Sequence, residues 1–112
     1  MTNMECVVNE YIDERGRSPY ADWIGSLRDR RARAKIILQV DKLELGLFGD
    51  VEPVGEGLSE LRIHYGPGYR VYFAKDGKRI YLLLCGADKS TQPKDIKKAR
   101  AYWQDHKRRN KQ

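Results

Sequence analysis

Residues 58–73 have the sequence LSELRIHYGPGYRVYF, in which apolar and polar side chains alternate on both sides of Gly66-Pro67-Gly68. An alternation with a period of two is typical of a β-strand with one buried face. We therefore expect two antiparallel strands joined by a tight turn at residues 66–68. With a three-residue turn, the facing pairs are Tyr65–Tyr69, Ile63–Val71, His64–Arg70 and Arg62–Tyr72.

A second hairpin is predicted directly downstream. Asp76-Gly77 is a strong two-residue turn signal, because both positions of that turn favour positive φ. Residues 79–85 then form a third strand, whose nearly continuous apolar run indicates burial on both faces. Closing the turn here places Tyr72 opposite Tyr81. One face of this meander is then an apolar core, and the other carries Glu60, Arg62, His64, Arg70, Tyr72 and Tyr81.

The remaining elements follow from capping and helical periodicity. Residues 5–12 are rich in β-branched and aromatic side chains and predict an opening strand. Ser18 is a suitable N-cap and Pro19 fits the first position of a helix that ends near residue 29. A second helix is expected over about 30–46, residues 50–57 are expected to be a loop, and a last helix covers about 93–108. The apolar stripes are Ile36, Val40, Leu43 and Leu47 in the second helix and Ile96, Ala99 and Trp103 in the last.

These elements predict an α+β fold. Its order is a strand, two helices, a three-strand antiparallel meander and a C-terminal helix, with the helices packed on one face of the sheet. The length fits a single domain over residues 1–112, ending in a basic tail from about residue 104.

The positive charge lies mainly in the last quarter of the chain. Residues 89–112 hold nine Lys or Arg and two Asp, a net charge of +7, whereas the whole chain carries +6. A second basic cluster covers residues 28–35. Such clusters suit a polyanionic partner, although a solvated helix face and a disordered basic tail explain the charge equally well. The candidate RNA contacts from these segments are Lys89, Arg30, Arg31, Lys94 and Lys97.

Other signals narrow the class of protein. No apolar run is long enough to span a bilayer, and the first residues lack the pattern of a secretory signal. Cys6 and Cys85 lie in apolar stretches, as buried reduced thiols do, so we expect a cytoplasmic protein without a membrane partner. The two histidines are far apart, and there is no Cys-x-x-Cys and no phosphate-binding glycine loop. We therefore expect no metal and no cofactor.

The predicted polar face has the groups that metal-free RNA cleavage needs. A base must take the proton of the attacking 2′-hydroxyl, and cations must stabilise the phosphorane. His64 is the candidate acid or base, Arg62 and Arg70 hold the phosphate, and Lys89 adds charge. Tyr72 or Tyr81 stacks a base or donates a proton. Structural roles remain open: a His64–Glu60 hydrogen bond, an Arg62–Glu60 pair and a Tyr72–Tyr81 pair. Arg70 has no obvious acidic partner.

Four segments resemble a known family: LFGDVEPV (47–54), GLSELRI (57–63), GPGYRVYF (66–73) and LCGADKSTQ (84–92). They are similar to the RelE/ParE superfamily of toxins, in particular to its RelE/HigB-type "addiction module killer" branch, over roughly residues 5–103. The resemblance implies the toxin of a type II toxin–antitoxin system that cleaves mRNA in the ribosomal A site. It also implies a tightly bound antitoxin, expected to be a helix-turn-helix protein encoded alongside, through which alone the toxin contacts operator DNA.

The resemblance also assigns roles to residues. Arg70 corresponds to a phosphate-binding catalytic arginine, Arg62 to a basic residue of the preceding strand, and Lys89 roughly to one after the last strand. Where RelE-like enzymes carry a catalytic tyrosine, this chain has residues 90–93, Ser-Thr-Gln-Pro, so His64 is a candidate from geometry alone. ParE-like members poison DNA gyrase without being enzymes, and an inactive nucleic-acid-binding relative is a third alternative.

Overall fold

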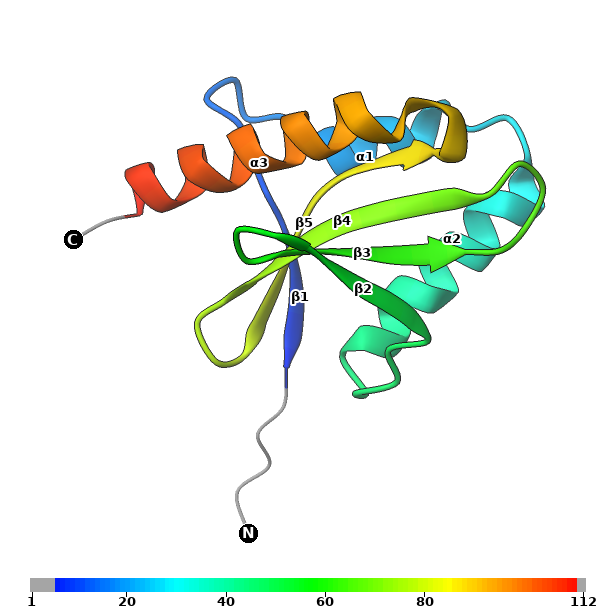
Figure 1. Ribbon diagram of the computed structural model, residues 1–112, viewed down its shortest axis with the longest axis horizontal. Helices are drawn as coiled ribbons and strands as arrows, with labels where there is room; N and C mark the ends of the chain where they lie inside the picture. Colours follow the sequence, from blue (N-terminus) through cyan, green and yellow to red (C-terminus); the bar gives the residue numbers. More distant parts are fainter. Residues whose placement is uncertain (1–5, 111–112) are drawn as a thin grey trace, which may run out of the picture.

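The structure is a computed structural model that describes residues 6–110 (Figure 1). The described part contains one five-stranded sheet with the strand order β1-β5-β4-β3-β2, in which β1 runs parallel to β5 and the other pairs are antiparallel. The fold is therefore α+β, with a mixed sheet and three helices. The elements are β1 Val7–Glu10, α1 Pro19–Ser26, α2 Arg30–Leu43, β2 Asp50–Gly55, β3 Leu58–Ile63, β4 Tyr69–Asp76, β5 Ile80–Asp88, a short 3₁₀ turn Lys89–Thr91 and α3 Gln92–Arg109.

Helices cover both faces of the sheet, so the prediction that they pack on one face is wrong. On one face, side chains of α1 and α2 form a core with Leu61, Val71 and Leu83. On the other face, Ala99 and Trp103 of α3 pack against a second core. The physical reason lies in β5. This strand carries apolar side chains on both of its faces, and each face needs a covering layer.

The segment 50–57, expected to be a loop, contains the edge strand β2. It pairs with β3, and its register shifts between Pro53 and Gly55. Proline lacks a backbone N–H and is tolerated on an edge strand, which pairs on one side only. Polar residues, Pro53 and Gly55 hide the strand pattern in this segment, which explains the wrong prediction.

The predicted register of the first hairpin is wrong by two residues. Ile63 pairs with Tyr69 and Arg62 with Arg70, so the connection spans residues 64–68 instead of 66–68. A shift of two residues leaves each side chain on its predicted face, because the side-chain period of a strand is two. Arg62 and Arg70 therefore still share a face.

The second hairpin has a larger error, because it does not close on the two-residue turn Asp76-Gly77. Asp76 pairs with Ile80 across residues 77–79, and Phe73 faces Leu83 instead of Ile80. A shift of three residues exchanges the two faces of β5. Tyr81 therefore lies on the α1 and α2 side and Tyr72 on the α3 side, so the expected Tyr72–Tyr81 pair is wrong.

The helix starts were predicted more accurately than the helix ends. α1 begins at Pro19, and the Ser18 hydroxyl accepts a hydrogen bond from the Ala21 amide at 3.0 Å. α2 ends at Leu43 instead of residue 46, and Leu47 is 56% exposed and outside the core stripe. The opening strand is shorter than predicted, and residue 5 lies outside the described residues. α3 extends into the segment expected to be a tail. None of the helices within residues 6–110 is long and apolar enough to cross a membrane.

Candidate functional site

Four of the predicted site residues line one small pocket at the end of the sheet. Arg62 and Arg70 face each other on β3 and β4, His64 follows β3, and Lys89 follows β5. The turn between β3 and β4 fixes this arrangement, because the Lys89 amide donates to the carbonyl oxygen of Gly68 at 3.1 Å. The grouping of these four side chains was predicted from the sequence, although their pairing was not.

A buried carboxylate lies beside the two arginines of the pocket. Glu60 is 1% exposed, and its side chain accepts a hydrogen bond from Nε of Arg62 at 2.9 Å. Nε of Arg70 lies 3.6 Å from the other carboxylate oxygen. The predicted Arg62–Glu60 pair is thus confirmed, and the expectation that Arg70 has no acidic partner is wrong. The register explains this, because Glu60 lies diagonally opposite Arg70.

Arg62 has further acidic neighbours on β2. Its guanidinium contacts Glu52 and lies 3.9 Å from Asp50. The hydrogen bond that Arg62 donates to Glu60 is the main cause that raises the pKa of Arg62, so this side chain stays charged. With three carboxylates around it, the Arg62 charge is already largely balanced.

Arg70 is different, because part of its guanidinium has no partner. Its side chain is 13% exposed, and within residues 6–110 its Nη1 is buried without a hydrogen bond. A buried donor without a partner carries a desolvation cost that an acceptor placed beside it removes. Nη1 of Arg70 is therefore suited to bind an oxygen of an anionic ligand.

His64 is paired with Asp50. In the described part of the chain, the His64–Glu60 hydrogen bond, which the sequence left open as a structural role, does not form. Nε2 of His64 lies 2.6 Å from a carboxylate oxygen of Asp50, and the imidazole side chain is 73% exposed. β3 ends at Ile63, and His64, the next residue, meets the first residue of β2, whose carboxylate also lies near Arg62. An ionised carboxylate only accepts, so Nε2 donates to Asp50, and in the neutral imidazole the lone pair is then on Nδ1. Sequence reasoning missed Asp50, although the alternation of Asp50, Val51 and Glu52 was a signal for the strand that positions it.

The two tyrosines assigned to base stacking lie outside this pocket. Tyr72 is fully buried on the α3 side, and this burial raises its pKa. Tyr81 is buried on the other face, edge-on to Phe48 and Phe73. The interpretation that both rings lie on one open face is wrong. α3 covers the face that holds Tyr72, and the three-residue shift in the register of β5 places Tyr81 on the other face.

The basic residues of the helices are exposed but do not line the pocket. Arg30 and Arg31 lie in the first turn of α2, and Lys94 and Lys97 lie on α3, across the sheet. The residues that the structure describes contain no group of three His, Cys, Asp or Glu side chains arranged to hold a metal ion.

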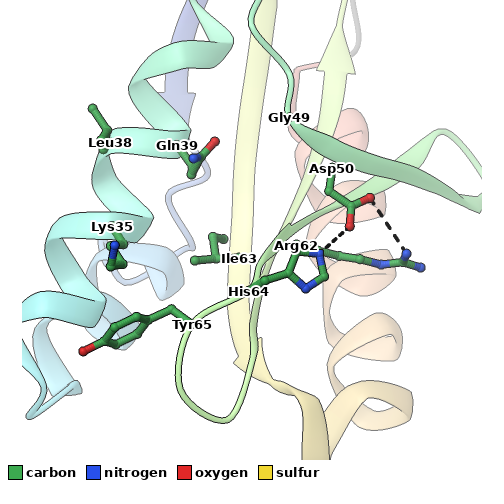
Figure 2. A pocket seen from close by; sticks show the side chains of 9 residues that line it. All are labelled: Lys35, Leu38, Gln39, Gly49, Asp50, Arg62, Ile63, His64 and Tyr65. Atoms are coloured by element: carbon green, nitrogen blue, oxygen red, sulfur yellow. Dashed lines mark hydrogen bonds and ion pairs between the residues drawn. The ribbon is translucent and has the colours of Figure 1, made fainter.

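A second pocket adjoins the first and shares Arg62, Ile63 and His64 with it. It is a cavity of about 320 Å³ between α2 and the ends of β2 and β3. Figure 2 shows α2 on one side of this pocket and residues 63–65 on the other, with the Tyr65 ring reaching back toward Lys35. The Lys35 ammonium nitrogen lies 5.3 Å from the centre of that ring. Lys35 belongs to the basic cluster of residues 28–35 and Tyr65 was predicted to lie opposite Tyr69, but neither was named as a site residue from the sequence.

Comparisons with known proteins give one family. A family model described as "Phage derived protein Gp49-like (DUF891)" matches residues 22–104. A protein of Haemophilus influenzae described as uncharacterized is 45% identical over 86 residues, which cover 77% of this chain and 87% of that protein. The resemblance to the RelE/ParE superfamily and its HigB-type branch is therefore wrong as a family assignment, because the matching model describes Gp49-like proteins. Much of the likeness rested on residues 57–63 and 66–73, which form a hairpin, and hairpins occur in many folds.

Proposed function

The chain belongs to the phage-derived Gp49-like family, and from this premise we propose that it is the toxin of a type II toxin–antitoxin pair that cleaves mRNA on the ribosome. The family is compatible with a toxin role and with an antitoxin partner. The proposal that the target is ribosome-bound mRNA in the cytoplasm goes further and rests on the pocket at the end of the sheet. The antitoxin we expect is a helix-turn-helix protein encoded beside the toxin.

One observation carries the proposal: an exposed imidazole oriented by a carboxylate shares a pocket with an arginine that has an N–H unpaired within residues 6–110. His64 and Asp50 supply the first part, and Nη1 of Arg70 supplies the second. Lys89 adds a second positive charge to the same pocket. These are the groups that cleavage of RNA by its own 2′-hydroxyl requires.

The proposed step is an in-line displacement at phosphorus. The 2′-oxygen attacks the adjacent phosphate, the new P–O2′ bond forms and the P–O5′ bond breaks, which gives a 2′,3′-cyclic phosphate and a 5′-hydroxyl end. Nδ1 of His64 takes the proton of the 2′-hydroxyl, Asp50 stabilises the imidazolium, and water protonates the leaving 5′-oxygen. Arg70 and Lys89 stabilise the negative charge on the non-bridging oxygens.

Arg62 is assigned a positioning role in this scheme. Its guanidinium is held by Glu60 and Glu52 and lies near Asp50, so little of its charge is available to a phosphate. The same contacts orient Asp50, which in turn holds the imidazole of His64. Replacing Arg62 is therefore expected to act through the orientation of His64, and it should change the pH profile of cleavage as well as its rate.

The test uses the full chain with ribosomes and a defined mRNA. Arg70→Lys keeps the charge beside Glu60 but loses the forked donor, so we expect cleavage to slow by roughly 100- to 1000-fold, the scale of one oxyanion donor. Arg17→Lys is the matched control, since Arg17 is an exposed arginine paired with Asp22 outside the pocket. Cleavage ends are mapped and tested for the cyclic phosphate.

Growth gives the second readout of the proposal. Expression of the wild-type chain alone should arrest growth, and coexpression with the adjacent small protein should restore it. Unimpaired growth at high soluble expression contradicts the toxin role. Arrest with intact mRNA and blocked supercoiling by purified gyrase contradicts the mRNA target and indicates a gyrase poison instead.

A further inference from the structure

The cavity between α2 and β3 has the surroundings of a nucleobase site. Leu38 and Ile63 give it apolar walls, and Tyr65 offers an aromatic ring that is half-buried against the core. Gln39 adds an amide, which presents a donor and an acceptor in one plane. Flat heteroaromatic rings with polar edges bind where a stacking surface and such an amide occur together.

We propose that this cavity binds one nucleobase of single-stranded RNA, stacked on Tyr65 and contacted at its edge by Gln39. The inference rests on the proposed function, because it identifies the base next to the phosphate that the Arg70 pocket holds. It replaces the stacking role that sequence reasoning gave to Tyr72 and Tyr81, both of which are buried.

The two pockets are placed as one nucleotide requires. Both are lined by Arg62, Ile63 and His64, so the base cavity and the phosphate pocket adjoin at these three residues. A base held on the α2 side brings its own ribose next to His64. The 2′-hydroxyl to be activated belongs to that ribose, and the phosphate it attacks then lies toward Arg70 and Lys89.

Lys35 links binding of a base in the cavity to the negative charge of the RNA backbone. Its ammonium group lies over the Tyr65 ring, at 5.3 Å from the ring centre, which is within the range of a cation–π contact. Lys35 has a flexible stem, so an RNA phosphate arriving at the rim draws the ammonium group from the ring and frees that surface for stacking. Arg31 is exposed one turn earlier on α2, and it extends the positive charge along the path of the RNA strand.

Gly49 shapes the polar end of the cavity. Its φ is +64°, and a Cβ added there would lie 3.1 Å from Oε1 of Gln39. Because Gly49 has no side chain, the Gln39 amide has room beside the loop that leads into β2. This supports Gln39 as the group that contacts the edge of a bound base.

The experiment measures cleavage on ribosomes carrying mRNAs that differ only in the base 5′ to the cleaved bond. We expect Tyr65→Leu to raise KM by about 5- to 150-fold, the range for one lost base–aromatic stack, with a smaller change in kcat. Tyr65→Phe keeps the ring, so it should raise KM much less than Tyr65→Leu does. Gln39→Ala should reduce the preference among the four bases, whereas Gln104→Ala, the same change on an exposed position of α3, should not.

Each outcome decides between the two claims. If the wild type cleaves but Tyr65→Leu and Gln39→Ala keep its KM and base preference, the base cavity is wrong and the proposed nuclease stands. If the same variants lose only affinity for the antitoxin, the cavity is a protein-docking site and the inference is overturned. If the wild type does not cleave ribosome-bound mRNA, both claims fail. Should Tyr65→Leu not fold, Gln39→Ala alone gives the decisive comparison, since it is a truncation on the rim of α2.

Discussion

The substitution Glu60→Gln tests whether the buried carboxylate holds the phosphate pocket together. Glu60 is 1% exposed and bonds Nε of Arg62 at 2.9 Å, with Nε of Arg70 at 3.6 Å. The amide preserves the shape of the side chain and removes its charge. Arg62 keeps its contacts to β2 carboxylates, but Arg70 is left largely buried and without an ion-pair partner among residues 6–110. The cost therefore falls mainly on Arg70.

The magnitude follows from that geometry. Breaking a fully buried ion pair by removing one partner costs about 3–5 kcal/mol. The Arg70–Glu60 distance is long and the pocket opens to solvent, so we expect the free energy of unfolding to fall by about 2–3 kcal/mol. An entropy of unfolding of about 2.1 cal/mol/K per residue over 112 residues converts this to a Tm lower by roughly 8–13 °C.

The assay is urea unfolding of the purified chain, with thermal melts alongside. Glu52→Gln is the matched control, because Glu52 also contacts Arg62 but is half exposed, and exposed pairs contribute about 0–1 kcal/mol. The double variant Glu60→Gln/Arg70→Met should be more stable than the sum of the two single changes predicts, since it removes both charges. A Glu60→Gln protein as stable as Glu52→Gln, or purely additive effects, would refute this reasoning.

Three further predictions concern other parts of the fold. Gly86→Ala should lower stability by about 1–3 kcal/mol in denaturant titration, because the new Cβ would lie 2.2 Å from the ring of Trp23, and wild-type stability would contradict that packing. Burial raises the pKa of Cys85 from 9.0 to about 12, so its thiol should resist iodoacetamide at pH 8.5 until the chain unfolds. The free energy of unfolding should fall as pH rises from 9 to 12, because the thiol ionises more readily in the unfolded chain. Rapid alkylation of the native protein would argue against this. The Tyr11 hydroxyl, 2.6 Å from Asp105, is the main cause that lowers the pKa of that carboxyl, so the stability it contributes is present above 3.8 and is lost as pH falls below that value. Tyr11→Phe should therefore make acid unfolding begin at a higher pH, and an unchanged acid midpoint would count against the contact.

Local signals in the sequence predicted local structure well. Ser18 and Pro19 give the start of α1 because an N-cap hydroxyl and a proline at the first helical position act within one turn. The alternation on each side of Gly66-Pro67-Gly68 likewise gave two strands. The register was not predictable in the same way. Turn length sets it, and the turns at 64–68 and 77–79 are longer than the turn-forming residues within them.

The parts of the site that were missed depend on neighbours distant in sequence. Asp50 orients His64 only because β2 pairs with β3, and β2 carries few of the residues that mark a strand. The sequence predicts that Tyr65 is a strand residue paired with Tyr69. It instead leaves the strand with the longer turn and reaches toward Lys35 on α2, which is thirty positions earlier in the sequence. Contacts of this kind follow from the packing of elements, which the residue pattern of one element does not specify.

The apolar run in β5 nevertheless contained the information that excludes an open sheet face. Tyr81 and Leu83 lie on the α1 and α2 side, and Leu82 and Leu84 lie on the side of α3. A strand with apolar side chains on both faces needs a covering layer on each, and the last amphipathic helix is the element left to provide the second. Once α3 takes that place, the core residues of β4 and β5 are covered on both faces. A polar site built on β3 and β4 must then lie at their ends, where the turn exposes His64 and the next pocket begins.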